Sequence, residues 1–179
     1  MKRLLFLLFL LMSCAPLLCP DEDGVRRDFS QFGAPQEYRA QLSVRYGLLR
    51  MPIRLEKTGG RFIIGDGERS IELQNLCINS VCFDLPITPD GLIFGKLLRG
   101  DEKASCGREG FLFTRDEGPF ESRYVFKDGK PALAEFYDKK KERRITLEYL
   151  DWAPQGYARA LRLKQGGISL LLTVDDLKF

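Results

Sequence analysis

The chain has 179 residues, of which 44% are hydrophobic and 30% are charged, with 28 Lys and Arg against 25 Asp and Glu. This composition is that of a globular protein; it excludes a disordered chain or a low-complexity fibre, and the small charge excess argues against a nucleic-acid partner. Histidine is absent, which excludes Ser-His-Asp and Cys-His catalysis and every metal site that contains histidine. We therefore expect no enzyme, no metal and no cofactor.

The N-terminus has the pattern of an export signal. Lys2 and Arg3 precede an apolar run over 4–12, which is shorter than the roughly 20 residues that span a bilayer and has the length of a signal-peptide core. The run ends in Leu11-Met12-Ser13-Cys14, which resembles the bacterial lipobox. That resemblance implies cleavage before Cys14 and a diacylglycerol on its sulfur. The alternative is an ordinary secretory signal that leaves a plain thiol.

This interpretation divides the chain into a signal peptide (1–13), a lipidated tether with a short helix (14–35) and one domain (36–179). Ala15, the residue after the lipidated cysteine, favours delivery to the outer membrane under the sorting rule of enteric bacteria. Without Lys2 and Arg3, 26 basic residues face 25 acidic ones. Membrane attachment is therefore expected from acyl chains and not from a polybasic surface.

Cys77 and Cys82 lie at either end of a short turn. If Asn79-Ser80 forms a two-residue hairpin turn, the two cysteines face each other with Cα atoms about 4.5 Å apart, which is within disulfide reach. An exported protein meets an oxidising compartment, so the spacing predicts a Cys77–Cys82 disulfide. Two free thiols are the alternative, and the cysteine spacing does not indicate zinc.

The elements expected after the tether's proline-rich start are one helix, many strands and one further helix. Val25, Phe29 and Phe32 recur at helical spacing and predict a short amphipathic helix. Strict alternation over 38–46 predicts a strand with one wet face. A helix of about ten residues is predicted over 88–100, because Thr88 suits an N-cap, Pro89 suits the first helical position and Gly100 suits the C-terminal end. Further strands are predicted at 53–57, 61–65, 70–76, 109–115, 121–127, 131–138, 144–151, 157–164 and 167–177.

The predicted fold class is mainly β (α+β), with a single curled antiparallel sheet of about 10–11 strands. A sheet this wide curls or closes because its strands twist. The apolar faces of the strands are expected to line one concave interior, with the second helix as a lid. The predicted ligand wall consists of Tyr38, Leu42, Val44, Phe62, Leu147, Tyr149, Leu170 and Leu172, and the predicted lid side chains are Ile93, Phe94, Leu97 and Leu98.

The order of these elements resembles the LolA/LolB family of lipoprotein carriers and receptors. The resemblance covers 36–179 and is carried by the lipobox, the long first strand, Leu85-Pro86, Leu97-Leu98-Arg99-Gly100 and a closing series of strands, Ile145–Trp152, Leu161-Arg162-Leu163 and Leu170–Val174. It implies an open half-barrel, lidded by short helices, that holds the acyl chains of lipoproteins. Cys14 fits the lipid-anchored LolB branch, which inserts lipoproteins into the outer membrane.

The resemblance also implies partners and a membrane-contacting loop. The partners are acylated lipoprotein cargo, a periplasmic carrier and the outer membrane. The protein is expected to be a monomer that its acyl anchor holds at the periplasmic face of that membrane. The family has an exposed apolar residue on a loop, but the corresponding turn here, 65–69, is polar. Leu48 and Leu49 are the substitutes, unless they belong to the core. The alternative function is a lipoprotein of the same fold that binds another lipid or acts as an interaction module of the cell envelope.

One basic cluster, Lys139–Arg144, has two interpretations. It contacts anionic headgroups or an acidic partner, or it is a solvated hairpin turn. A nucleic-acid role is remote because the cluster is short and the chain carries an export signal.

Overall fold

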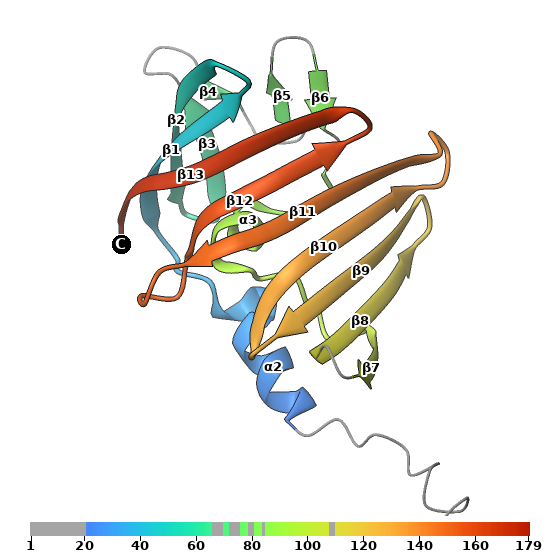
Figure 1. Ribbon diagram of the computed structural model, residues 1–179. Helices are drawn as coiled ribbons and strands as arrows, with labels where there is room; N and C mark the ends of the chain where they lie inside the picture. Colours follow the sequence, from blue (N-terminus) through green and yellow to red (C-terminus); the bar gives the residue numbers. More distant parts are fainter. Residues whose placement is uncertain (1–20, 66–69, 72–75, 79–80, 84, 108–109) are drawn as a thin grey trace, which may run out of the picture.

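The computed structural model describes residues 21–65, 70–71, 76–78, 81–83, 85–107 and 110–179. These residues form an 11-stranded antiparallel sheet in the order β4-β3-β2-β1-β13-β12-β11-β10-β9-β8-β7, and β5 pairs with β6 in a separate hairpin. The large sheet curls without closing, because β4 and β7 lie at its two edges (Figure 1). The predicted class, a single curled antiparallel sheet with short helices, is confirmed. The strands are β1 (Tyr38–Tyr46), β2 (Leu49–Thr58), β3 (Arg61–Gly65), β4 (Ser70–Ile71), β5 (Leu76–Ile78), β6 (Val81–Phe83), β7 (Lys103–Gly107), β8 (Gly110–Glu117), β9 (Phe120–Lys127), β10 (Lys130–Asp138), β11 (Arg143–Trp152), β12 (Ala158–Gln165) and β13 (Ile168–Lys178).

The two-residue period of the strands sets which side chains are buried. In β1, Tyr38, Ala40 and Leu42 are buried, while Arg39 and Gln41 between them are exposed. The same alternation buries every second residue of β9 and β11, because successive side chains of a strand point to opposite faces. The strand expected at 38–46 is therefore confirmed to the residue.

Three strand predictions need correction. The strand expected at 70–76 is not a single strand, because Ser70–Ile71 (β4) belongs to the large sheet and Leu76 begins β5 of the separate hairpin. β7 was not predicted, because a five-residue strand of small residues, KASCG, has almost no apolar alternation to detect. β2 begins at Leu49 rather than at 53, so the turn before it is only Gly47-Leu48. Pro52 is tolerated within β2 opposite Ser43 of β1.

In the described part of the chain, three helical elements accompany the sheet: α2 (Glu22–Phe29), the 3-10 turn η2 (Gln31–Gly33) and α3 (Pro89–Phe94). The expected N-terminal helix is confirmed as α2. The second helix is much shorter than the predicted 88–100. Thr88 caps it as expected, but Gly95 adopts φ 66° and its N–H bonds back to the carbonyls of Asp90 and Gly91. This left-handed residue ends the helix, and Gly100 plays no capping role.

The core occupies the concave side of the sheet. One cluster is centred on aromatic side chains of β8, β9 and β10, among them Phe113, Tyr124, Phe126 and Phe136. A second cluster joins α3 to β1 and β2 through Ile93, Phe94 and their neighbours. Within the described ranges, no helix has the length and apolar character that crossing a bilayer requires.

Candidate functional site

An apolar cavity lies between α3 and the β1–β3 end of the sheet. Its volume is about 20 Å³, so it is as small as a single water site. Its wall has almost no polar surface, and among the lining residues within the described ranges Thr88 is the one with a polar side chain. Such a wall suits a hydrocarbon ligand and leaves a polar ligand without hydrogen-bond partners. The lining residues are Leu42, Ile53, Leu55, Ile64, Leu85, Ile87, Thr88, Pro89, Leu92 and Leu172.

A buried ion pair holds α3 over this cavity. Asp90, in the first turn of α3, accepts a hydrogen bond from the Lys57 ammonium of β2 at 2.7 Å and one from the Tyr38 hydroxyl of β1 at 3.0 Å. Lys57 also donates to the carbonyl of Pro35 at 2.7 Å. Both charged residues are only 8% exposed. One cation thus neutralises one anion at the junction of lid and sheet, where water has little access.

A second polar contact attaches α3 to β11. The Tyr149 hydroxyl donates to the backbone carbonyl of Gly91 at 2.5 Å, and its ring stacks on Trp152 with centroids 5.3 Å apart. Burial raises the pKa of Tyr149 well above its ordinary value. Burial, and then the nearby Asp90 carboxylate, raise the pKa of Tyr38 as well. Burial therefore favours the neutral form of both phenols, in which they donate to the lid.

The end of the lid helix requires glycine. A Cβ at Gly95 would lie 2.6 Å from Pro131 and 2.8 Å from Trp152, distances that real Cβ atoms do not adopt. The chain then runs beside the end of α2, where Leu98 and Phe29 are joined by a backbone hydrogen bond of 3.1 Å. The segment after α3 is therefore confined between α2 and the sheet.

The predicted site residues fall into two groups. Leu42 and Leu172 line the cavity. Tyr38, Ile93 and Phe94 belong to the cluster around the cavity, with Phe62 packed against it. The remaining members lie in the larger core cluster and are almost fully buried: Val44, Leu97, Leu98, Leu147, Tyr149 and Leu170. Whether any of them contacts a ligand stays a prediction.

Sequence reasoning missed most of the cavity wall. Ile53, Leu55 and Ile64 line it from β2 and β3, and Leu85 and Ile87 line it from the segment before α3. The alternation of Ile53 with Leu55 marked one face of a strand, but nothing local indicated that this face lies opposite the lid. Lys57 and Asp90 gave no signal either, because a charged residue is exposed by default.

A second buried network fixes α2 to the opposite edge of the sheet. The Glu102 side chain is 0% exposed and accepts from Arg115 of β8 at 2.7 Å and from Arg26 of α2 at 3.2 Å. The backbone N–H groups of Arg99 and Gly100 donate to the same carboxylate at 2.7 and 3.0 Å. Every strong acceptor position of this carboxylate is therefore filled.

The β1–β2 hairpin exposes apolar side chains. Leu48 is 104% exposed, Leu49 54% and Tyr46 44%, so these residues are not part of the core. Their proposed role as a membrane-contacting loop remains a prediction.

A larger hollow of about 540 Å³ lies over β8 to β11, and it is polar. Its lining contains equal numbers of acidic and basic residues, with Arg123 paired to Glu135 at 2.9 Å. An acyl chain there would displace hydrated and paired charges, which is unfavourable. The small apolar cavity is therefore the better candidate for a hydrocarbon ligand. The hollow is lined by Asp101, Lys103, Thr114, Arg115, Asp116, Glu121, Ser122, Arg123, Glu135, Tyr137 and Arg144.

The cysteine predictions are tested only in part. Cys77 and Cys82 are Cα partners in the β5–β6 pair, so the predicted register is confirmed, but their side chains and the turn lie outside the described residues. Cys106 of β7 is disulfide-bonded, to a cysteine whose side chain is not among those described. Cys14 also lies outside the described ranges. In the described part of the chain, no group of three or more Cys, Asp or Glu residues has an arrangement that could hold a metal ion.

No protein-family model matches the sequence, and no curated protein matches it. Among solved structures, the LolA superfamily protein NE2245 from Nitrosomonas europaea is similar over 88% of this chain and 92% of its own. The sequence identity is 13% and the TM-score is 0.49. A likeness at this level leaves ligand and partners to be argued from the geometry of the chain itself.

Proposed function

We propose that this chain binds the acyl chains of lipoproteins in the apolar cavity beneath α3. The observation that carries the proposal is the cavity wall, in which nine of the ten lining residues that the structure describes are apolar. Hydrocarbon gains free energy on leaving water for such a wall, at roughly 25 cal/mol per Å² of buried apolar surface. No catalytic group is needed for this role.

Binding in this cavity requires the lid to move. A volume of about 20 Å³ does not admit an acyl chain, so α3 and the segment 85–88 must separate from β2 and β3. The contacts that resist this movement are the Lys57–Asp90 ion pair and the Tyr38 and Tyr149 hydrogen bonds. Together with the buried apolar side chains of α3, these contacts oppose lid opening.

We further propose a LolB-like role for the whole chain. Cys14 would carry the acyl anchor at the periplasmic face of the outer membrane, and a monomer would receive lipoprotein cargo from a periplasmic carrier. The support is the Leu11-Met12-Ser13-Cys14 motif and the order of elements over 36–179. The test is incorporation of a labelled fatty acid. Cys14→Ser should abolish both incorporation and processing, and normal labelling of that variant would exclude the anchor.

The cavity is tested with two adjacent residues of β3 that lie on opposite faces. Ile64 lines the cavity, whereas Ile63 is 44% exposed. We expect Ile64→Lys to weaken the binding of a fluorescent fatty-acyl probe at least about tenfold, because the ammonium would lose hydration in the occupied cavity. Ile63→Lys should bind like the wild type. Equal binding by both variants, or no saturable binding by the folded wild type, contradicts the proposal.

The alternative ligand is a lipid that is not attached to a protein. The same apolar wall would accept it, so the cavity geometry does not distinguish the two. Mass spectrometry of the protein purified from its own membrane separates them. A co-purifying lipoprotein supports the carrier role, and a free lipid alone supports the alternative.

A further inference from the structure

Cys106 lies on β7, an edge strand of the large sheet, and it is disulfide-bonded. Along β7 it is half-buried, on the same face as Ala104, which packs against the main core cluster. The side chain of Cys106 therefore points to the concave face of the sheet, where α2 also packs. The sequence offers four candidate partners: Cys14, Cys19, Cys77 and Cys82.

Two of these candidates belong to the separate hairpin. Cys77 and Cys82 are Cα partners of each other in the β5–β6 pair, which is not hydrogen-bonded to the large sheet. Figure 1 shows this hairpin and β7 at opposite ends of the molecule. Since the Cα atoms of bonded cysteines are less than about 7 Å apart, neither hairpin cysteine is a partner for Cys106.

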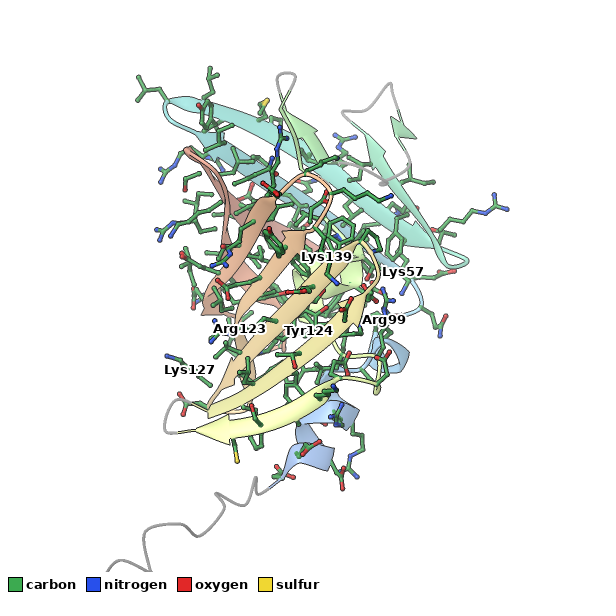
Figure 2. All side chains as sticks on the ribbon, turned by 90° about the vertical axis from the view of Figure 1, so that its right-hand side faces the viewer. Lys57, Arg99, Arg123, Tyr124, Lys127 and Lys139 are labelled. Carbon is green, nitrogen blue, oxygen red and sulfur yellow. The ribbon has the colours of Figure 1, made fainter. Side chains whose placement is uncertain are left out.

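α2 crosses the strands and leads from β11 toward β7 when it is followed backward from its last residue. The Phe29 ring contacts Trp152 of β11 and Phe126 of β9, with centroids 6.3 and 5.3 Å apart. Three residues earlier, the Arg26 guanidinium lies 4.9 Å from the ring centroid of Phe113 in β8. The next strand in this direction is β7. Figure 2 shows α2, in blue, beside this edge of the sheet.

The chain before α2 is long enough to reach Cys106. From Arg26 back to the start of α2 at Glu22 the helix extends about 6 Å, which exceeds the spacing of about 4.8 Å between neighbouring strands. Cys19 is two residues before Asp21, the first described residue, and two residues of chain span at most about 7 Å. This distance from the β7 edge is within the range of a disulfide.

We propose that Cys19 and Cys106 form a disulfide that joins the chain before α2 to the edge strand β7. The two thiols lose two protons and give two electrons to a disulfide-bearing oxidoreductase of the compartment to which the chain is exported, and the disulfide of that oxidant is reduced to a dithiol. Cys14 is excluded as the partner because its sulfur carries the proposed acyl group. Cys77 and Cys82 remain opposite each other as a separate pair.

The bond determines where the tether leaves the domain. Five residues separate Cys14 from Cys19, so at most about 18 Å of chain joins the acyl anchor to the β7 edge. β7 is the last strand in the sheet order, whereas the cavity is lined from β1, β2, β3 and β13. The anchor is thus attached at the edge of the sheet away from the cavity. This consequence rests on the proposed lipid anchor, but the pairing itself does not.

The experiment is peptide mapping of the full chain, exported through its own N-terminal signal and purified without reductant. Free thiols are alkylated, and the unfolded protein is then digested with trypsin without reduction. Cleavage after Lys and Arg separates the candidates, because Cys106 lies on 104–108, both hairpin cysteines lie on 70–96, and Cys19 lies on the peptide that ends at Arg26. We expect 104–108 to be joined to the peptide that ends at Arg26. A link between 104–108 and 70–96, or an alkylated Cys106, would overturn the proposal.

Two matched serine variants separate Cys19 from Cys14, which lies on the same peptide when the lipid is absent. Cys19→Ser should leave Cys106 open to alkylation, whereas Cys14→Ser should keep 104–108 joined to the N-terminal peptide. The reverse pattern would overturn the pairing. Failure of the lipid anchor is a distinct result, because normal fatty-acid labelling of Cys14→Ser excludes the anchor and leaves the disulfide link in place.

A second measurement tests whether the bond holds α2 on the sheet. Arg27 is an exposed residue of α2, and tryptic cleavage after it in the folded protein requires α2 to open locally. Cys19→Ser should be cleaved there about tenfold faster than Cys77→Ser, since each variant loses one thiol but only the first frees the chain before α2. Equal cleavage rates in the two variants would contradict a bond that secures α2.

Discussion

Glu102 and Asp90 are both buried carboxylates that join a helical segment to the sheet, but they are held very differently. Glu102 accepts four hydrogen bonds, two from guanidinium groups and two from backbone N–H groups. Asp90 accepts from one ammonium and one hydroxyl. The Arg26 guanidinium that Glu102 binds lies over the Phe113 ring, 4.9 Å from its centroid, whereas α3, which carries Asp90, borders an apolar cavity. Fewer hydrogen bonds therefore fix the carboxylate of α3 than fix Glu102, while apolar packing buries all six residues of α3.

The largest effect is expected from Glu102→Gln. This change removes the fully buried anion that Arg115 and Arg26 share, and leaves Arg115 with Glu117 and Arg26 with Glu22, each at 2.8 Å. Breaking a buried pair typically destabilises by up to about 3–5 kcal/mol, and the free energy of unfolding in urea measures it. Glu22→Gln removes the half-buried partner of the same Arg26, and its effect should stay below about 1 kcal/mol. Similar losses in the two variants would contradict the role assigned to Glu102.

Asp90 offers a sharper test, because a double substitution separates the fold from the lid. Asp90→Asn alone should destabilise by about 2–3 kcal/mol, since it leaves the Lys57 ammonium buried and unpaired. Replacing both partners, with Lys57→Met/Asp90→Leu, should recover the part of the loss that comes from the unpaired ammonium, while the buried Tyr38 hydroxyl stays without its acceptor. The same double variant should take up a fluorescent acyl probe faster in stopped-flow measurements. Unchanged uptake would mean that the ion pair does not restrain the lid.

The Tyr149 hydroxyl is the weaker attachment of the lid. Tyr149→Phe removes its hydrogen bond to the Gly91 carbonyl without changing the packing of the ring, and should cost about 1 kcal/mol in urea unfolding. Tyr46→Phe, at a half-exposed tyrosine, is the control and should have no measurable effect. A loss as large as that of Asp90→Asn would place the main restraint of the lid on β11 and not on β2.

The smallest effect is expected at Glu148, which also has two cationic partners but lies near the surface. Hydrogen bonds from Lys164, assisted by Arg162, hold its pKa below the ordinary value. Because the folded pKa is the lower one, the stabilisation is complete above the unfolded pKa and is lost as pH falls through the folded pKa. Glu148→Gln should cost at most about 1 kcal/mol at neutral pH. The difference in the free energy of unfolding between Glu148→Gln and the wild type should vanish in acid. A larger loss of stability, or one that does not change with pH, would show that exposure does not weaken this ion pair.

Local pattern in the sequence determined the strands and the helix starts. The alternation over 38–46 predicted β1 because a half-buried strand needs one apolar face. Thr88 and Pro89 marked the start of α3 because a capping oxygen and a fixed φ suit the first turn. The curl of the sheet was also predictable, since strand twist prevents a flat sheet of this width.

Only the tertiary structure decided where α3 ends and what it covers. Gly95 stops the helix in a left-handed conformation, at a point where Pro131 and Trp152 leave no room for a side chain. The cavity wall brings Ile53 and Ile64 opposite Leu85 and Leu92, and Lys57 meets Asp90 across 33 positions of the sequence. Periodicity reports which face of an element is apolar, but it carries no information on which other element that face meets. Pairing between distant residues is set by sheet order and chain reversal, so the lid, its ion pair and its cavity emerge only when the whole sheet has formed.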